Sequence, residues 1–114
     1  MNVRNTFTLC GTVKDVPVAE DHPDGSRTIK FVVSAKNNYK RRDGTETFEE
    51  LPVAVYRTAE MLADPKRGAG VAGSLKAGDH VALQGSVRNN NWTDASGHPH
   101  YGLVLQVESL DVLS

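Results

Sequence analysis

The sequence predicts an all-β protein in which five strands curl into a closed barrel, with one short helix between the third and fourth strands. Apolar and polar residues alternate over most of the chain, as they do in half-buried strands. Glycines interrupt two of these strands, at Gly11 and Gly85, and a strand interior tolerates glycine where the sheet bends sharply. At 114 residues the chain is long enough for one core, so we expect a single domain over residues 1–114.

Two strands are expected in the first third of the chain. Residues 7–13, FTLCGTV, and residues 28–36, TIKFVVSAK, both alternate, and a turn-rich stretch at residues 20–27, EDHPDGSR, separates them. The inward positions are Phe7, Leu9, Gly11, Val13, Ile29, Phe31, Val33 and Ala35. We expect these side chains to form the first half of the core.

A polar, basic hairpin loop at residues 36–46, KNNYKRRDGTE, leads to the third strand at residues 47–56, TFEELPVAVY. An Asp-Gly pair at 43–44 marks the tip of this hairpin. In the third strand the inward positions are Leu51, Val53 and Val55, and the outward positions are Phe48, Glu50, Ala54 and Tyr56. Pro52 cannot donate to a ladder, so we expect it at a sheet edge or a bulge.

The remaining elements are one helix and two strands. Residues 57–65, RTAEMLADP, predict a short helix that begins near Thr58 and ends before Pro65, and a glycine-rich, mobile connector follows over residues 66–78. The fourth strand, residues 80–88, places Val81, Leu83, Gly85 and Val87 inward, and the last strand, residues 101–113, places Leu103, Leu105 and Val107 inward. Five strands with a helix after the third are typical of the OB fold.

Composition places the chain among ordinary globular proteins, with 39% hydrophobic and 24% charged residues. No apolar run is long enough to cross a bilayer, and the N-terminal residues do not resemble a signal peptide, so we expect a cytoplasmic protein without a membrane partner. A single cysteine, Cys10, excludes an internal disulfide and suits a reducing compartment. We expect its thiol to be packed.

The residues do not indicate an enzyme. His98 and His100 lie close together in the sequence HPH, but no cysteine or carboxylate stands beside them at metal-ligand spacing, so we expect surface histidines. Cys10 has no neighbouring base that would activate its thiol. We therefore expect no catalytic residues, no cofactor and no metal.

Aromatic and basic side chains indicate a binding surface instead. Single-stranded nucleic acid needs cations for its phosphates and flat rings for its bases, and each stacked base contributes about 1–3 kcal/mol. The candidate stacking residues are Trp92, Tyr56, Tyr39 and Phe48, and the candidate phosphate-binding residues are Lys36, Lys40, Arg41, Arg42, Arg57 and Arg88. The net charge is only −1, but the basic residues gather between 36 and 42, and a local field can attract a polyanion. Alternatively, Tyr56 and Phe48 pack in an oligomer interface.

Four segments in order resemble the bacterial-type single-stranded DNA-binding proteins over nearly the whole chain: NTFTLCGTV, TIKFVVSAKNNY, VAVYRTAE and LKAGDHVALQGSVRNNNWTDASGHPHYGLVLQV. The resemblance implies an OB barrel that binds single-stranded DNA independently of sequence in replication, recombination and repair, and that assembles as a homotetramer. Trp92 matches the tryptophan of the family's W-T-D hairpin, Tyr39 an aromatic at the end of the second strand, and Tyr56 a stacking phenylalanine before the helix. A further family tryptophan falls at Glu50, where Phe48 is the candidate replacement.

The resemblance leaves several alternatives open. The family usually ends in an acidic tail that recruits other proteins, whereas this sequence ends in SLDVLS, so we expect no recruitment through a tail unless a tail was removed. A phage or mobile-element version acting in the bacterial cytoplasm would look the same. A second hypothesis is a dimeric replication-restart protein that resembles primosomal replication protein N. A third is an OB module that binds a protein or an oligosaccharide.

Overall fold

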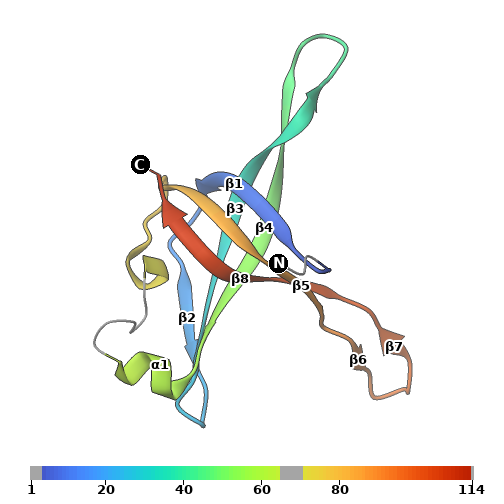
Figure 1. Cartoon of the computed structure of the whole chain (residues 1–114). Coiled ribbons are helices and arrows are strands. Elements are labelled where there is room, and N and C mark those ends of the chain that lie inside the picture. The colour runs from blue at the N-terminus through green and yellow to red at the C-terminus, as the bar shows by residue number, and fades with distance from the viewer. Residues whose placement is uncertain (1–3, 65–70, 114) are drawn as a thin grey trace.

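A closed five-stranded barrel forms the centre of the computed structural model, which describes residues 4–64 and 71–113 (Figure 1). The barrel strands are β1 (Phe7–Val13), β3 (Arg27–Lys40), β4 (Glu46–Arg57), β5 (His80–Asn89) and β8 (Leu103–Val112). The remaining elements are β2 (Val18–Asp21), α1 (Ala59–Ala63), the 3-10 helix η1 (Val71–Ser74), β6 (Trp92–Thr93) and β7 (Pro99–His100).

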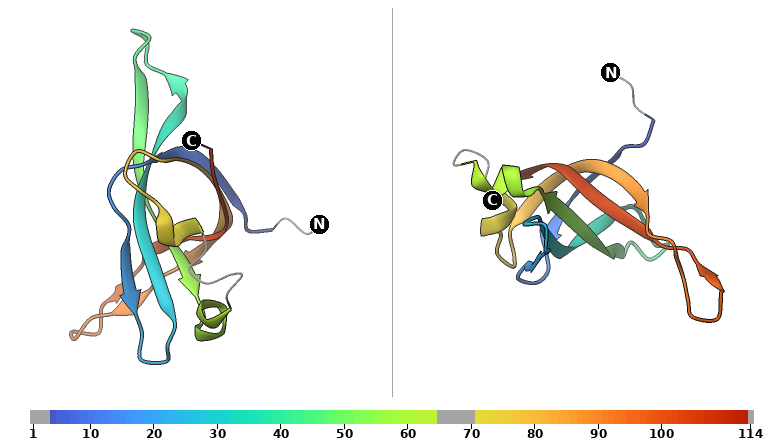
Figure 2. Two further views of the ribbon diagram at one scale, coloured as in Figure 1. Left: turned by 90° about the vertical axis from the view of Figure 1, so that its left-hand side faces the viewer. Right: turned by 90° about the horizontal axis from the view of Figure 1, so that it is seen from below.

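Strand β1 closes the barrel because it pairs with two partners. The sheet order is β1-β5-β8-β4-β3-β2, and β1 also pairs with β3 through Thr12 and Val13 (Figure 2). All pairings are antiparallel except the short one between β4 and β8. Because α1 lies between the third and fourth barrel strands, the predicted OB topology is confirmed.

Both mid-strand glycines lie where another backbone approaches closely. A Cβ atom at Gly11 would lie 2.5 Å from the Ser34 carbonyl oxygen, and one at Gly85 only 1.9 Å from the Gln106 carbonyl oxygen. Real side chains do not approach backbone oxygens this closely, so these positions admit no larger residue without a shift of the strands. The structure thus shows a close backbone approach at both glycines, and the sharp bends of the sheet stay a prediction.

The core follows the predicted alternation. Its buried residues are Val13, Ile29, Phe31, Val33, Val53, Val55, Leu75, Val81, Leu83 and Val107, with Phe7, Leu9, Leu105 and Leu110 packed against them. Leu110 joins the core because the β5–β8 register shifts between Gln84 and Gly85, which changes the alternation after Val107. Leu103 was also predicted to point inward, but it is 79% exposed. It is the first residue of β8, where the strand extends beyond the barrel.

Two predictions are wrong in detail. Strand β2 forms where the sequence indicated only a loop and turn; its four residues are all exposed, so they carry no apolar alternation, and pairing with β3 alone orders them. Cys10 is exposed rather than packed, because its side chain lies on the side of β1 opposite Leu9.

The predicted helix is confirmed at both ends. Thr58 is the N-cap residue, and its hydroxyl oxygen accepts a hydrogen bond from the Met61 N–H at 3.1 Å. The helix ends at Ala63, before Pro65. Residues 65–70, in the connector that the sequence predicted to be mobile, lie outside the described residues. No helix in the described part of the chain is long and apolar enough to cross a membrane.

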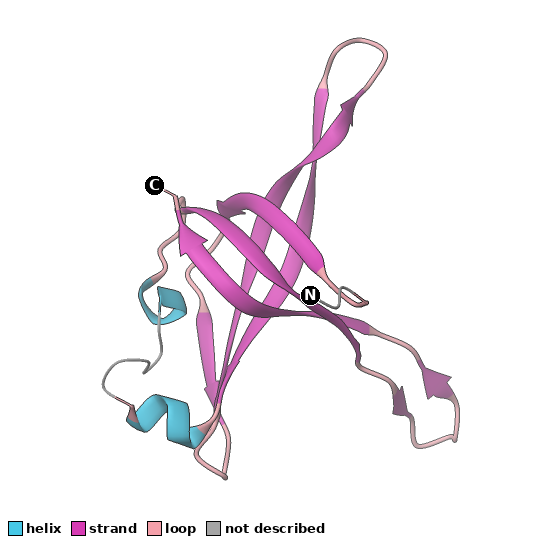
Figure 3. Ribbon diagram, viewed as in Figure 1, coloured by secondary structure: helices cyan, strands magenta, loops and turns pink. Residues whose placement is uncertain are grey.

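Two hairpins project from the barrel in different directions (Figure 3). One is the outer part of β3 and β4, with its turn at residues 41–45, and the other carries β6 and β7 between β5 and β8 (Figure 1). Asp43 orders the first turn, because its Oδ1 atom accepts a hydrogen bond from the Thr45 N–H at 2.9 Å. These hairpins carry most of the exposed aromatic side chains.

Candidate nucleic-acid interface

The paired strands β3 and β4 present a continuous surface outside the barrel, which we call the outer face. Its members alternate with the core residues along both strands: Thr28, Lys30, Val32, Ser34 and Lys36 from β3, and Phe48, Glu50, Pro52, Ala54 and Tyr56 from β4. Tyr56 lies opposite Thr28 near one end, and Phe48 lies opposite Lys36 near the other. The path along β4 from Phe48 to Tyr56 is about 27 Å, because a strand rises roughly 3.3–3.4 Å per residue.

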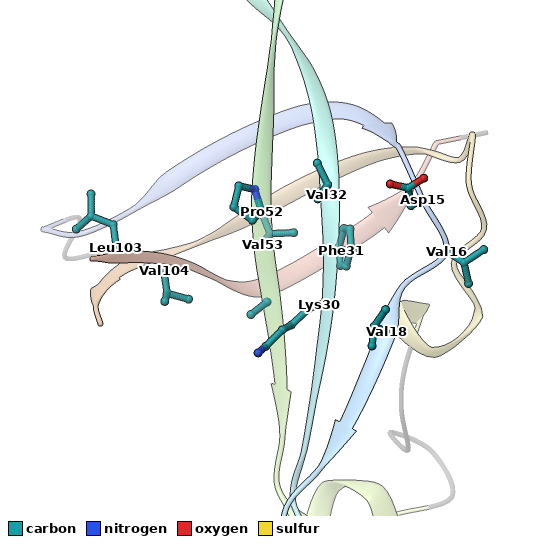
Figure 4. Close-up of a pocket in the computed structure, with 11 residues that line it drawn as sticks. Asp15, Val16, Val18, Lys30, Phe31, Val32, Pro52, Val53, Leu103 and Val104 are labelled. Atoms are coloured by element: carbon teal, nitrogen blue, oxygen red, sulfur yellow. The ribbon is translucent and has the colours of Figure 1, made fainter. Parts of the chain in front are cut away.

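An apolar groove of 460 Å³ lies on the outer face between Tyr56 and Phe48 (Figure 4). Val32 and Pro52 contribute to its lining from paired positions on β3 and β4. Val18 lines it from the β2 side, and Leu103 and Val104 line it from the start of β8 (Figure 4). Pro52 is tolerated here because the β4–β8 pairing begins only at Val53, so that side of β4 is open at Pro52.

The β3–β4 hairpin brings two of the predicted aromatic residues together with cations. Tyr39 is 62% exposed and Phe48 is 57% exposed. Tyr39, Lys36 and Lys40 line one hollow of 210 Å³ near the tip. Phe48 lies directly across the ladder from Lys36. The predicted combination of an open ring and a neighbouring cation is therefore present on this hairpin.

The charges are less segregated than the sequence indicated. Lys36 pairs with Glu46 at 3.6 Å, and Lys30 pairs with Glu20 at 3.0 Å, a contact that lowers the pKa of the Glu20 carboxyl. Five predicted cations have no carboxylate within ion-pair distance among the described residues: Lys40, Arg41 and Arg42 at the tip of the β3–β4 hairpin, and Arg57 and Arg88 elsewhere. Positive charge without a carboxylate partner therefore gathers at the tip of the β3–β4 hairpin.

The two remaining predicted cations lie elsewhere. Arg57 continues the inward series of Val53 and Val55, and its Nε atom is buried without a hydrogen-bond partner among residues 4–64 and 71–113. Arg57 therefore does not share the outer face with Tyr56. Arg88 lies beside Val104 of β8, at the edge of the groove, and its Nε donates to the Ser86 hydroxyl oxygen at 3.2 Å.

Trp92 is an exposed residue of the β6–β7 hairpin and not a core residue. Its side chain is 58% exposed, and its ring stacks on the His100 imidazole with 4.2 Å between ring centroids and 10° between planes. Tyr101, directly after β7, is 81% exposed. Sequence reasoning did not single out Tyr101, although it lies in the same polar stretch that indicated Trp92.

Glu50 stands in the middle of the outer face, two positions from Phe48 and two from Pro52. Its Oε1 atom lies 2.8 Å from the Lys14 Nζ, and this contact raises the pKa of the Lys14 ammonium. The described residues contain no group of three or more His, Cys, Asp or Glu side chains that could hold a metal ion. The arrangement of open rings, an apolar groove and cations suits a ligand that combines flat apolar groups with negative charge.

Comparison with known proteins identifies the family to which the chain belongs. Residues 4–113 match the model of the Single-strand binding protein family. A protein of Caldanaerobacter subterraneus subsp. tengcongensis described as a single-stranded DNA-binding protein is 28% identical over 109 residues, which are 95% of this chain and 65% of that relative. The chain thus spans less than two thirds of the relative's length. Neither comparison favours the replication-restart alternative. Because the family model covers nearly the whole chain, the protein belongs to the Single-strand binding protein family.

Proposed function

We propose that the protein binds single-stranded DNA independently of sequence, by stacking bases on exposed aromatic rings and by pairing phosphates with lysine and arginine. The observation that carries this proposal is the placement of the rings. Trp92, Tyr39, Phe48 and Tyr56 are all between 42% and 62% exposed, so each leaves much of a flat ring open to solvent. An apolar groove continues the outer face between Phe48 and Tyr56.

The groove is better suited to bind bases than phosphates. Its lining is largely apolar, and Lys30 at its side already pairs with Glu20. The free cations at the tip of the β3–β4 hairpin and Arg88 beside Val104 flank this apolar track, where a sugar-phosphate backbone would need them. Base stacking is tolerant of sequence because every base has a π-face, which favours binding without sequence preference.

The proposal includes residues 1–114 acting as one binding unit, without catalysis, in the cytoplasm. Membership in the family supports a role in protecting exposed strands during replication, recombination and repair. We also propose assembly into a homotetramer, and light scattering distinguishes it from a dimer or a monomer.

The binding proposal is tested by titration of the intrinsic fluorescence of Trp92, the single tryptophan of the chain. Oligo-dT is expected to quench the emission, because a base stacks on the exposed indole, and the affinity should fall as salt rises because counterions are released. A duplex of equal length is the control and should bind more weakly, because its bases are not free to stack. Equal affinity for single strand and duplex, or binding that is independent of salt, would contradict the proposal.

A further inference from the structure

His100 covers one face of the Trp92 ring. The two residues lie directly opposite each other in the β6–β7 ladder, which brings their side chains onto the same side of the hairpin. Their rings are nearly parallel, with 10° between planes and 4.2 Å between centroids. The indole nevertheless stays 58% exposed. One face of Trp92 is therefore occupied from within the protein while much of the ring remains open.

Asp94 holds the imidazole in this position. Its Oδ2 atom lies 2.9 Å from the His100 Nε2, and its Oδ1 accepts hydrogen bonds from the Ser96 and His98 N–H groups, both at 2.9 Å. The turn itself is closed by a hydrogen bond from the Asp94 N–H to the His98 carbonyl oxygen at 3.0 Å. The three contacts to the carboxylate, led by the one to His100 and followed by those from the His98 and Ser96 N–H groups, lower the pKa of the Asp94 carboxyl. The carboxylate is thus fixed at the turn and fixes the histidine.

An exposed side chain that must become ordered on binding reduces affinity by its lost rotamer freedom. Trp92 lies in a two-residue strand outside the barrel, where the core does not restrain it. The stack on His100 restrains it instead, through a chain of contacts that begins at the backbone of the turn.

We propose that His100 is a positioning residue that stacks beneath Trp92, orders the indole before binding and leaves its opposite face for a nucleobase. This inference rests on the proposed function. It assigns to His100 a role that depends on the flat ring itself and not only on its contact with Asp94. A glutamine at this position can keep a hydrogen bond to Asp94 but has no ring, whereas a phenylalanine keeps a ring and lacks the hydrogen bond.

The test compares His100→Gln with His100→Phe in the full chain. His100→Gln should weaken oligo-dT binding by about 2- to 12-fold, the effect expected when one side chain must be immobilised on binding. Time-resolved anisotropy of Trp92 in the free protein should show faster local rotation in this variant, and Tm should not change because the hairpin lies outside the core. His100→Phe should restore both slow rotation and affinity to near those of the wild type.

His98→Gln is the matched control. His98 belongs to the same turn and its side chain is 77% exposed, with Nδ1 3.8 Å from Asp94 Oδ1, but its ring does not stack on Trp92. This variant should leave both measurements unchanged. Wild-type anisotropy or affinity in His100→Gln, or equal losses in His100→Gln and His100→Phe, would overturn the proposal. If the wild-type protein itself does not bind oligo-dT, the proposed function fails, whereas the anisotropy comparison still decides whether His100 orders the indole.

Discussion

Glu50 introduces a negative charge into the surface that we propose for a polyanion. It lies on the outer face between Phe48 and Pro52. Lys14 neutralises it at 2.8 Å, so the pair contributes neither a free anion nor a free cation. A phosphate that approached Lys14 would have to compete with the carboxylate. We therefore expect the contact between Glu50 and Lys14 to limit binding at this position.

Replacement of Glu50 by glutamine is therefore expected to raise the affinity for oligo-dT, because it releases Lys14. If Lys14 then binds one phosphate, the slope of log K against log salt should steepen by about 0.7, the value for one contact to a single strand. Glu49→Gln is the control, since Glu49 is a neighbour on β4 with the same charge and accepts a hydrogen bond from Asn37 at 3.2 Å, away from the outer face. Equal effects of the two variants would show that only net charge matters.

The exposed rings could be predicted from sequence for two different reasons. Alternation along β4 placed Phe48 and Tyr56 opposite the core residues, and the polar surroundings of Trp92 and Tyr39 left no core for them to enter. The stack of His100 on Trp92 could not be predicted in this way. It depends on which residues face each other across the five-residue connection between β6 and β7, and the turn at Asp94 decides that register.

At the scale of elements, the tip of the β3–β4 hairpin brings together three cations that have no carboxylate partner among the described residues. Arg41 and Arg42 lie in the turn, and Lys40 ends β3. Elsewhere, Arg27 pairs with Asp21 at 2.6 Å and Lys30 with Glu20 at 3.0 Å. The near-zero net charge of the chain thus conceals one hairpin end with a local positive field.

Double substitution of Arg41 and Arg42 by glutamine should reduce the salt dependence of oligo-dT binding. If each arginine binds one phosphate, the slope of log K against log salt should become shallower by about 1.4, at about 0.7 per contact. Arg27→Gln removes a cation that is already paired with Asp21, and it should leave the slope unchanged. The free energy of unfolding of the double variant should equal that of the wild type, because both side chains are exposed. An unchanged slope would place the phosphate contacts elsewhere.

The barrel strands were predictable from their alternation, and the helix was predictable from its N-cap and the following proline although α1 buries no residue. The helix was located by Thr58 and Pro65, and four of the barrel strands alternate throughout their barrel portions. Strand β2 escaped prediction because all of its residues are exposed and only its ladder with β3 orders it. The register shift opposite Gly85 was also unpredictable, since a bulge changes the alternation without a distinct composition.

At the scale of the whole molecule, the candidate platforms are spread over separate projections of the barrel. Phe48 and Tyr39 lie on the β3–β4 hairpin, Tyr56 near the opposite end of the outer face, and Trp92 on the β6–β7 hairpin (Figure 1). The groove connects two of these regions, because Leu103 and Val104 follow the β6–β7 hairpin and also line the groove. One strand of DNA that contacts all platforms must therefore pass along the outer face.

This arrangement predicts how affinity depends on oligonucleotide length. OB folds occupy roughly 4–16 nucleotides, and a strand that reaches from Phe48 to Tyr56 must follow about 27 Å of β4 before it extends to Trp92. We therefore expect the affinity for oligo-dT to rise with oligonucleotide length through most of that range. The increase in affinity at the length that first quenches Trp92 should be absent in Trp92→Ala, while the increases at other lengths should remain. Calorimetry with a length series measures both. If a tetranucleotide binds as tightly as the longest oligomer, the platforms do not act on one strand, and a single local site accounts for binding.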